Sequence, residues 1–464
     1  MVENIYLYFT SDIHSHFENW PKIAHFLKQR KQNHEQKKES YFLFDNGDHI
    51  DRFHPITEAS LGKSNVELLN HGGYHAVTIG NNEGITLPSE SFHTLYKDAS
   101  FEVVCANIHP VEKKTPNWLK PYTILETKSG LKVGVMGLTA PFNAFYQPLG
   151  WNAISPYDAL DTFLPTLSSQ SDIVILLSHL GFSEDEYISN NYNNIDFIVG
   201  GHTHHLLKDG EMVKDTLLGA VGKHGFYVGE ACIEWDHSQK RIITKSAKAM
   251  DLTNAPEDEE VLSLLNKYEG QAHQILDEKI ISLKDPLKVN WFKESALMTD
   301  LTDLLREWTK ADCAMLNAGV LLEDLPMGDI TREDIHRICP HPINPATVSI
   351  VGDQLLETLR MVHTKSFMEY ELKGFGFRGK QIGKMIFSNI VLKTKKGHDG
   401  EERILHVLIN NEPLDLNKVY TLATADTFTF GTLLPSVSRA KDKKYFLPEF
   451  LRDLLTYSLI RRNG

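Results

Sequence analysis

Five short motifs in this sequence carry side chains of the types that bind divalent metal ions. They are Asp-x-His, Gly-Asp, Gly-Asn-Asn-Glu, Ser-His and Gly-Gly-His-Thr-His, and the candidate ligands within them are Asp12, His14, Asp48, Asn81, His179, His202 and His204. Carboxylate, imidazole and amide oxygen are the ligands preferred by metals that act on phosphate. The pattern therefore indicates a metal site, and chemistry on a phosphate group is the first hypothesis.

Each motif taken alone has a simpler interpretation. A Gly-Asp at the end of a strand is usually a turn or a helix cap, and an Asp-x-His pair also occurs by chance. The alternative is seven unrelated polar residues, each with its own hydrogen bonds. The order of the motifs argues against this alternative, because all five lie between Ile5 and His204 and each follows an apolar run of its own.

The elements that must position these motifs are predicted β-strands. Ile5 to Phe9 is rich in strand-forming residues and runs directly into the first motif. Similar runs predict strands at 41–46, 75–79, 101–106, 131–137, 172–177 and 195–199, with helices at 20–30, 64–71 and 157–168 and a solvated helix end and loop at 31–40. Strands that end in polar residues and alternate with helices predict a layered α/β domain with its site at the strand ends. A β-rich stretch from Leu217 to Lys245 is predicted to complete this domain.

Length and composition limit the possible partners. A chain of 464 residues exceeds what one core usually serves, so two domains are expected. The net charge of −13 gives no support to a large basic groove, which argues against duplex nucleic acid as a partner. Small anionic substrates fit, because a metal pair reverses the local field. No apolar run reaches transmembrane length, so no membrane association is predicted, and the sequence does not predict an oligomeric state.

The cysteines and the N-terminal segment favour a location inside the cell. Cys105, Cys232, Cys313 and Cys339 are far apart, so neither a zinc ribbon nor a disulfide framework is indicated. The first residues lack a basic region followed by a long apolar run, so a secretory signal is not predicted. We therefore expect reduced thiols and a cytoplasmic protein.

The second half of the chain has a different pattern. Pro256 and the acidic residues after it predict the start of a helix, which we interpret as a linker at 251–280 between a catalytic domain at 1–250 and a second domain at 281–464. The second domain is predicted to have helices near 294–308, 331–338 and 353–363 and strands near 386–394 and 404–409.

The five motifs, in this order, resemble the calcineurin-like metallophosphoesterase superfamily. Asn317-Ala318-Gly319, Gly328-Asp329-Ile330-Thr331 and the segment from Thr421 to Thr424 are similar to the C-terminal domain of 5'-nucleotidases, and the whole pattern is close to the cytoplasmic bacterial YunD-like branch. The resemblance implies a four-layer α/β sandwich of two mixed sheets flanked by helices, followed by a smaller α/β domain.

The resemblance also implies how two metal ions are shared. Asp12, His14, Asp48 and His204 would hold one ion, and Asp48, Asn81, His179 and His202 would hold the other. Asp48 would bridge ions roughly 3.5–4 Å apart, and a hydroxide between them would attack phosphorus. The ligand types suit Mn, Zn, Fe, Co or Mg, and the sequence does not choose among them.

One position departs from the family pattern. Members usually carry Gly-Asn-His-Glu, with an aspartate three residues after the histidine, but this chain has Asn82 and Ile85 at those positions. An amide can donate a hydrogen bond but cannot carry a proton at neutral pH. We expect His49 or Arg52 to take the role, since an arginine fork grips phosphate well. The alternatives are that Arg52 pairs with Asp51 or Asp45 and that His49 supports a ligand or belongs to the loop.

In the family, the second domain holds a nucleobase between aromatic rings and supplies arginines to the phosphate. This chain keeps Asn317 and Gly319, but Val320-Leu321-Leu322 lacks the usual arginine. The remaining candidate substrate-binding residues are His341, Phe375, Phe377, Arg378, Phe428 and Phe430. The alternative for the glycine-rich loop at 373–379 is a tight turn with core phenylalanines.

The combined prediction is a two-metal hydrolase of phosphate esters that acts on nucleotide 5'-phosphates or related small nucleotides in nucleotide catabolism. One alternative is a cyclic-nucleotide phosphodiesterase or nucleotide-sugar pyrophosphatase that uses the same metals. Another is a weakly active nucleotide-binding sensor, because Asn82 replaces the usual histidine.

Overall fold

Strand β1 (Val2–Thr10) contributes to two hydrophobic cores. In the computed structural model, which describes residues 2–397 and 402–463, successive side chains of this strand point to opposite faces of a sheet, as in any extended strand. Ile5, Leu7 and Phe9 lie in the apolar cluster between two sheets, whereas Tyr8 lies in a cluster on the other face. The sheet is therefore covered on both sides.

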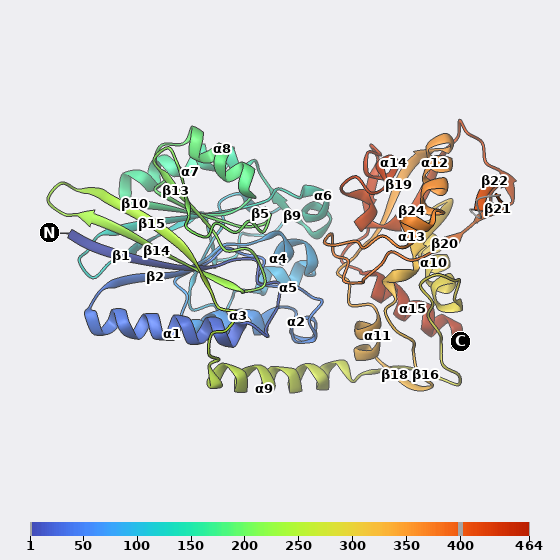
Figure 1. Cartoon of the computed structure of the whole chain (residues 1–464), viewed down its shortest axis with the longest axis horizontal. Coiled ribbons are helices and arrows are strands. Elements are labelled where there is room, and N and C mark those ends of the chain that lie inside the picture. Colours follow the sequence, from blue (N-terminus) through green and yellow to red (C-terminus); the bar gives the residue numbers. More distant parts are fainter. Residues whose placement is uncertain (1, 398–401, 464) are drawn as a thin grey trace. The chain divides into compact units, whose positions relative to one another are not determined.

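The chain forms two compact units, one up to Ala272 and one from His273 onward (Figure 1). The strands of the first unit are β1, β2 (Ser40–Asp45), β3 (Ala76–Val77), β4 (Glu102–Val104), β5 (Ile108–Pro110), β6 (Leu119–Lys120), β7 (Tyr122–Glu126), β8 (Lys132–Thr139), β9 (Trp151–Ala153), β10 (Ile173–His179), β11 (Phe197–Gly200), β12 (Glu211–Val213), β13 (Thr216–Ala220), β14 (Tyr227–Asp236) and β15 (Arg241–Asp251). Its helices are α1 (Trp20–Lys37), α2 (Pro55–Ser60), α3 (Lys63–Gly72), α4 (Asn81–Thr86), α5 (Ser89–Thr94), α6 (Asn143–Tyr146), α7 (Pro156–Gln170) and α8 (Phe182–Asn191). Helix α9 (Glu259–Leu276) contains the boundary between the units.

Two mixed sheets form the centre of the first unit. The first has the strand order β15-β14-β1-β2-β3-β4-β6, and β1 runs parallel to β2 but antiparallel to β14. The second has the order β12-β13-β11-β10-β8-β7, and β8 runs parallel to β10 but antiparallel to β7.

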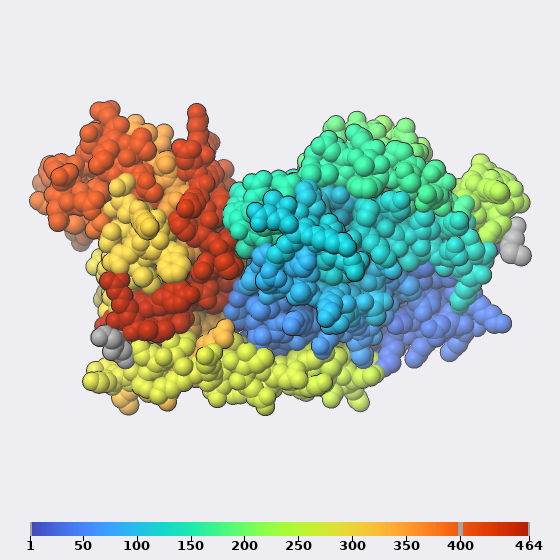
Figure 2. Space-filling view, turned by 180° about the vertical axis from the view of Figure 1, so that it is seen from behind, coloured from blue at the N-terminus to red at the C-terminus, as the bar shows by residue number. Residues whose placement is uncertain are grey.

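Helices cover the outer face of each sheet. Apolar residues of α1 and α3 pack on the first sheet, and those of α7 and α8 pack on the second. The predicted four-layer sandwich is therefore confirmed. The segment from α5 to β7, cyan in Figure 2, forms much of the surface on the opposite side of this unit.

Some element boundaries differ from the sequence-based expectation. The helix predicted at 20–30 continues to Lys37, because buried His34 and Leu27 keep the helical spacing through the lysine-rich stretch. The short strands β5, β6, β7 and β9 were not predicted, since two- to five-residue strands carry little periodic signal. Among the described residues, no helix has both the length and the apolar character that crossing a membrane requires.

The second unit is a smaller α/β domain around one core. Its strands are β16 (Lys279–Leu283), β17 (Cys313–Asn317), β18 (Gly328–Thr331), β19 (Pro345–Val351), β20 (Met385–Ser388), β21 (Ile390–Lys396), β22 (Glu402–Ile409), β23 (Glu412–Pro413), β24 (Val419–Ala425) and β25 (Lys443–Tyr445). Its helices are α10 (Ala296–Thr309), α11 (Arg332–Ile338), α12 (Gly352–Val362), α13 (Lys365–Met368), α14 (Pro435–Ser438) and α15 (Leu451–Asn463). The main sheet has the order β20-β17-β24-β19-β25, and α10 and α15 pack against its core.

Candidate metal centre

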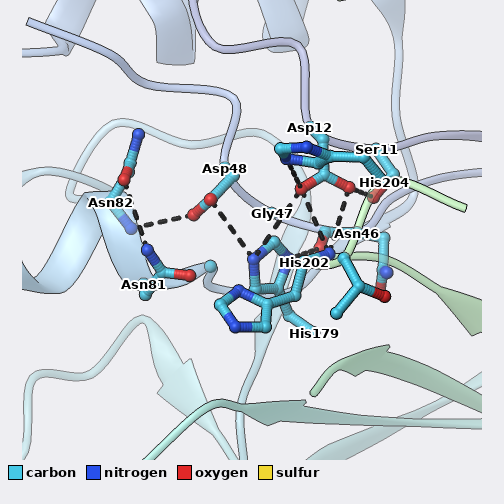
Figure 3. Close-up of polar contacts among 12 residues, drawn as sticks. Ser11, Asp12, Asn46, Gly47, Asp48, Asn81, Asn82, His179, His202 and His204 are labelled. Atoms are coloured by element: carbon cyan, nitrogen blue, oxygen red, sulfur yellow. Dashed lines mark hydrogen bonds and ion pairs between the residues drawn. The ribbon is translucent and has the colours of Figure 1, made fainter. Parts of the chain in front are cut away.

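Adjacent parallel strands bring the five sequence motifs to one edge of the two sheets. Asp12 follows β1, Asp48 follows β2, and Asn81 begins α4 after β3, and these three strands pair in parallel. In the second sheet, His179 ends β10, and the Gly-Gly-His-Thr-His motif follows β11, which pairs in parallel with β10. Figure 3 shows the side chains from the two sheets converging.

The backbone at this edge adopts an uncommon conformation. Five of the seven candidate ligands have left-handed φ values, namely Asp12 (54°), His14 (49°), Asp48 (50°), His202 (68°) and His204 (57°). A left-handed residue other than glycine costs about 1–2 kcal/mol and is held only where its surroundings enforce it. Such strain is typical of a functional site.

Two glycines let the loops around Asp48 approach each other. A Cβ on Gly47 would lie 2.3 Å from the Gly80 nitrogen, and a Cβ on Gly80 would lie 2.1 Å from Asp48 Oδ1. Only glycine fits at either position. The loops after β2 and β3 therefore touch directly behind Asp48.

The first cluster of candidate ligands consists of Asp12, His14 and His204. The Asp12 Oδ1 atom lies 3.4 Å from His204 Nε2 and 3.9 Å from His14 Nε2, and the two Nε2 atoms lie 3.3 Å apart. One carboxylate and two imidazoles thus point at one small volume, as a divalent cation requires.

The second cluster consists of Asp48, His179 and His202. Asp48 Oδ2 lies 3.3 Å from His179 Nε2 and also 3.6 Å from His14 Nε2 in the first cluster. The other oxygen of Asp48, Oδ1, accepts a hydrogen bond of 2.8 Å from the Asn82 N–H (Figure 3). Asp48 therefore turns a single carboxylate oxygen toward both clusters.

Two buried side-chain atoms that lack hydrogen-bond partners could ligate a cation. The Asn46 carbonyl accepts a hydrogen bond of 2.7 Å from His179 Nδ1, so Nε2 is the ring nitrogen that could ligate a metal after losing its proton. His179 Nε2 and Asn81 Oδ1 are buried and have no hydrogen-bond partner among the described residues. Buried polar atoms are almost always paired, so two such atoms beside two carboxylates indicate a ligand.

The electrostatics of the cluster also favour cations. Burial lowers the pKa of His179, but the Asp48 and Asp12 carboxylates outweigh that effect and raise this pKa to about 10. Burial and the charge of His179 lower the pKa of His202 to about 4, so His202 is neutral and able to ligate. Protons on the imidazoles thus balance the buried carboxylates, and metal ions would displace them.

Comparison with known proteins assigns the family. Residues 5–206 match the calcineurin-like phosphoesterase family, and residues 279–432 match the 5'-nucleotidase C-terminal domain. The chain is 40% identical over 460 residues to the metallophosphoesterase YunD of Bacillus subtilis, across 99% of this chain and 100% of YunD. The chain belongs to this metallophosphoesterase family. It is a metal-dependent phosphoester hydrolase whose cofactors are two divalent metal ions.

More distant relatives of this metallophosphoesterase share its fold. The 5'-nucleotidase of Bos taurus is 22% identical over 410 residues, which cover 77% of this chain and 69% of that protein. A putative 5'-nucleotidase from Staphylococcus aureus gives a TM-score of 0.69 at 18% identity, with 98% of this chain and 96% of that one covered. The NAD nucleotidase of Haemophilus influenzae gives 0.68 at 16% identity, with 99% and 96% covered.

Asn82 of the metallophosphoesterase faces a candidate metal ligand. Its amide nitrogen lies 3.0 Å from His14 Nδ1 and 3.2 Å from the Ile50 carbonyl oxygen. Ile85 is a partly buried side chain packed on the apolar core, so no carboxylate stands near Asn82 at that position. The Asn82 side-chain amide therefore contacts the ring of His14.

Three residues outside the predicted ligand set support the ligands. Asp51 Oδ2 lies 3.5 Å from His14 Nδ1, where a carboxylate fixes the ring orientation. The Ser15 hydroxyl accepts a hydrogen bond of 2.8 Å from the Asp51 N–H. Glu83 accepts bonds from the Asp48 and Gly80 N–H groups and so ties the two loops together. Only Glu83 had a sequence signal, since it belongs to the Gly-Asn-Asn-Glu motif.

His49 and Arg52, the expected substitutes for Asn82, are both buried. Arg52 pairs with Glu58, a partner that the sequence-based alternatives did not name. Its Nε and Nη2 atoms lie 2.8 and 3.0 Å from the Glu58 carboxylate, and its Nη1 donates to the Thr86 carbonyl at 2.9 Å. The guanidinium is thus engaged by α2 and α4.

Five of the candidate substrate-binding residues in the second unit are enclosed in its interior. These are Asn317, Gly319, His341, Phe377 and Phe428. The His341 ring stacks on Phe377 at 5.1 Å, accepts the Arg378 N–H at Nδ1 and donates to the Val320 carbonyl through Nε2. Both nitrogens of the His341 imidazole are therefore hydrogen-bonded inside the domain.

The more accessible candidates are Phe375, Phe430 and Arg378. Phe375 is 53% exposed, has a left-handed φ of 50° and lies in the turn that Phe377 N–H closes on Gly374 O. Its ring lies 6.1 Å from the Phe430 ring, with only 12° between the two planes. A strained turn thus presents an aromatic ring to solvent, parallel to a second ring.

Proposed function

We propose that this metallophosphoesterase hydrolyses nucleotide 5'-phosphates. Asp12, His14, Asp48 and His204 would hold one divalent ion, and Asp48, Asn81, His179 and His202 would hold the other. One observation carries this proposal, namely the position of Asp48 Oδ2 within 3.6 Å of an imidazole nitrogen in each cluster. A single oxygen so placed suits a bridge between two ions.

The bound ions would neutralise charge on the phosphate and activate water for attack on phosphorus. The protein would hold the ligand rings in place through Asp51 and the Asn46 carbonyl, which fix the proton positions on His14 and His179. Asn82 would steady His14 rather than carry a proton, so we expect slower turnover than in an enzyme with a histidine there.

The second unit would supply the nucleotide specificity. Phe375 and Phe430 are near-parallel rings, and an aromatic ring stacks on any nucleobase. Arg378 lies close by in the same glycine-rich loop and would contribute positive charge. This assignment favours a substrate with a flat base over a simple alkyl phosphate.

We also propose a cytoplasmic location and the functional division into a catalytic domain at 1–250, a linker at 251–280 and a substrate-binding domain at 281–464. All four cysteines are free thiols, which suits a reducing compartment. The linker would contain α9.

The test is turnover by protein loaded in turn with Mn, Zn, Fe, Co or Mg. The substrates are nucleoside monophosphates, cyclic nucleotides, nucleotide sugars and an aryl phosphate. We expect release of phosphate from the monophosphates, and loss of this activity in Asp48→Asn but not in the control Asp209→Asn, which changes an exposed loop residue. Preference for cyclic nucleotides would replace the proposal with a phosphodiesterase, and preference for nucleotide sugars would replace it with a nucleotide-sugar pyrophosphatase. Nucleotide binding with no turnover in any metal would replace it with a sensor.

A further inference from the structure

His224 lies in a turn that does not itself require an imidazole. His224 and Gly225 have φ values of 64° and 71°, which is the conformation of a turn that favours Asn-Gly. The His224 N–H donates to the Asp12 carbonyl at 2.8 Å, and Asn19 donates to the His224 carbonyl at 2.9 Å. The turn is thus fixed to the backbone of a candidate metal ligand, and histidine occupies a position where asparagine would satisfy the backbone.

The His224 ring lies beside the first metal cluster. It stacks on His16 with 3.6 Å between ring centroids and meets His14 edge-on at 6.0 Å. His16 is itself held by Glu18, whose carboxylate lies 2.7 Å from His16 Nδ1. No side-chain hydrogen bond of His224 occurs among the described residues, and the ring is only half-buried. The ring is therefore fixed by stacking while its nitrogens stay available.

The three groups that the sequence offered for contact with phosphate are buried or already contact protein atoms. Arg52 holds Glu58, His49 is buried, and the Asn82 amide is turned onto His14. His224 borders the same His14 ring that Asn82 supports. Among the described residues, His224 is a half-buried imidazole next to the first cluster that belongs to neither group of candidate ligands.

We propose that His224, held by its stack on His16, donates an imidazole N–H to the phosphate group of the substrate at the Asp12, His14 and His204 side of the centre. This inference rests on the proposed phosphate-ester substrate. It assigns a substrate-contacting role to a residue outside the five sequence motifs. A neutral imidazole suffices, because one of its nitrogens always carries a proton.

The test uses the full chain with Mg or Zn bound and the variant His224→Asn, because asparagine tolerates the left-handed turn. Inorganic phosphate is the probe. Calorimetry measures its Kd, elemental analysis measures the metal content, and NMR of ¹⁵N-imidazole histidine follows the ring. We expect about a 10-fold rise in Kd and a similar fall in kcat/KM for an aryl phosphate, as for loss of a hydrogen bond to a charged group. The metal content should stay at the parental value. The control is His25→Asn on α1, whose ring contacts Gln29.

Two results would overturn the role of His224. One is an unchanged Kd for phosphate in His224→Asn, together with a His224 resonance that does not shift when phosphate is added to the parent protein. The other is a loss of metal from His224→Asn equal to that of His14→Ala, which would show that His224 supports a metal ligand instead. If His224→Asn does not fold, His16→Ala removes the stacking partner instead, and the same rise in Kd is expected. This test is independent of whether the proposed function is correct. If the parent protein binds phosphate but hydrolyses no ester, calorimetry still shows whether His224 contributes to phosphate binding.

Discussion

The buried Arg52–Glu58 pair can be tested by a double-mutant cycle. The two side chains are each 8% exposed, and the guanidinium meets both carboxylate oxygens within 3.0 Å. Arg52→Gln would leave the Glu58 charge buried without its partner, which typically costs about 3–5 kcal/mol. For a domain of this size, about 2–4 °C of melting temperature corresponds to 1 kcal/mol, so the first unit should melt about 6–20 °C lower. Glu58→Gln should cost a similar amount.

The double variant separates two roles of Arg52. With both charges removed, neither member of the pair is left without the other, and the melting temperature should recover to within a few degrees of the parent. If Arg52 serves only to join α2 to the Thr86 carbonyl of α4, the double variant should keep the KM of the parent for an aryl phosphate. The assay is thermal unfolding followed by tryptophan fluorescence, together with steady-state kinetics. A double variant that melts normally but has a KM raised 10-fold or more would refute this reasoning and would show that Arg52 contributes to substrate binding.

Three further predictions follow from the two units. Asp48→Asn should lower the metal content below two ions per chain by elemental analysis and reduce turnover at least about 10³-fold, because the proposed shared ligand is lost; a full metal content would contradict it. Burial raises the pKa of Asp426 to about 7, whereas the unfolded chain releases this proton near pH 4. The folded state therefore binds more protons between these values, so the stability of the second unit should fall as pH rises from about 4 to 7 and then level off. Asp426→Asn should flatten that profile in thermal unfolding at several pH values, and an unchanged slope would exclude Asp426 as its cause. Phe375→Ala should raise KM for nucleoside monophosphates about 10-fold and leave KM for a small alkyl phosphate unchanged, with Tyr187→Ala on the first unit as the control; equal effects on both substrates would exclude base stacking.

The strand-end motifs were visible in the sequence because their chemistry coincides with a strong periodic signal. Each candidate ligand follows an apolar run that becomes a buried strand, so the fold and the position of the site follow from the same residues. The supporting contacts had no such signal. Asp51 reaches His14 only because the loop after β2 folds back, and no spacing rule predicts that return.

Burial decided what the sequence left open. The composition around Arg52 is equally compatible with a phosphate contact and an internal ion pair, and Glu58 is identified as its partner only by the packing of α2. In the second unit, Phe375 and Phe428 are chemically alike, yet one is exposed in a turn and the other is fully enclosed. His224, the proposed phosphate contact, had no sequence signal, because it lies in a turn that is brought beside Asp12 only by the fold.

The contact between Gly47 and Gly80 has a consequence for engineering this centre. A single methyl group at either glycine would collide with the other loop or with Asp48. The conformations of the loops after β2 and β3 therefore depend on each other. In libraries that vary only one of the two loops, most variants would therefore have a distorted metal centre. Attempts to change metal preference should therefore randomise both loops jointly and retain the two glycines as fixed points.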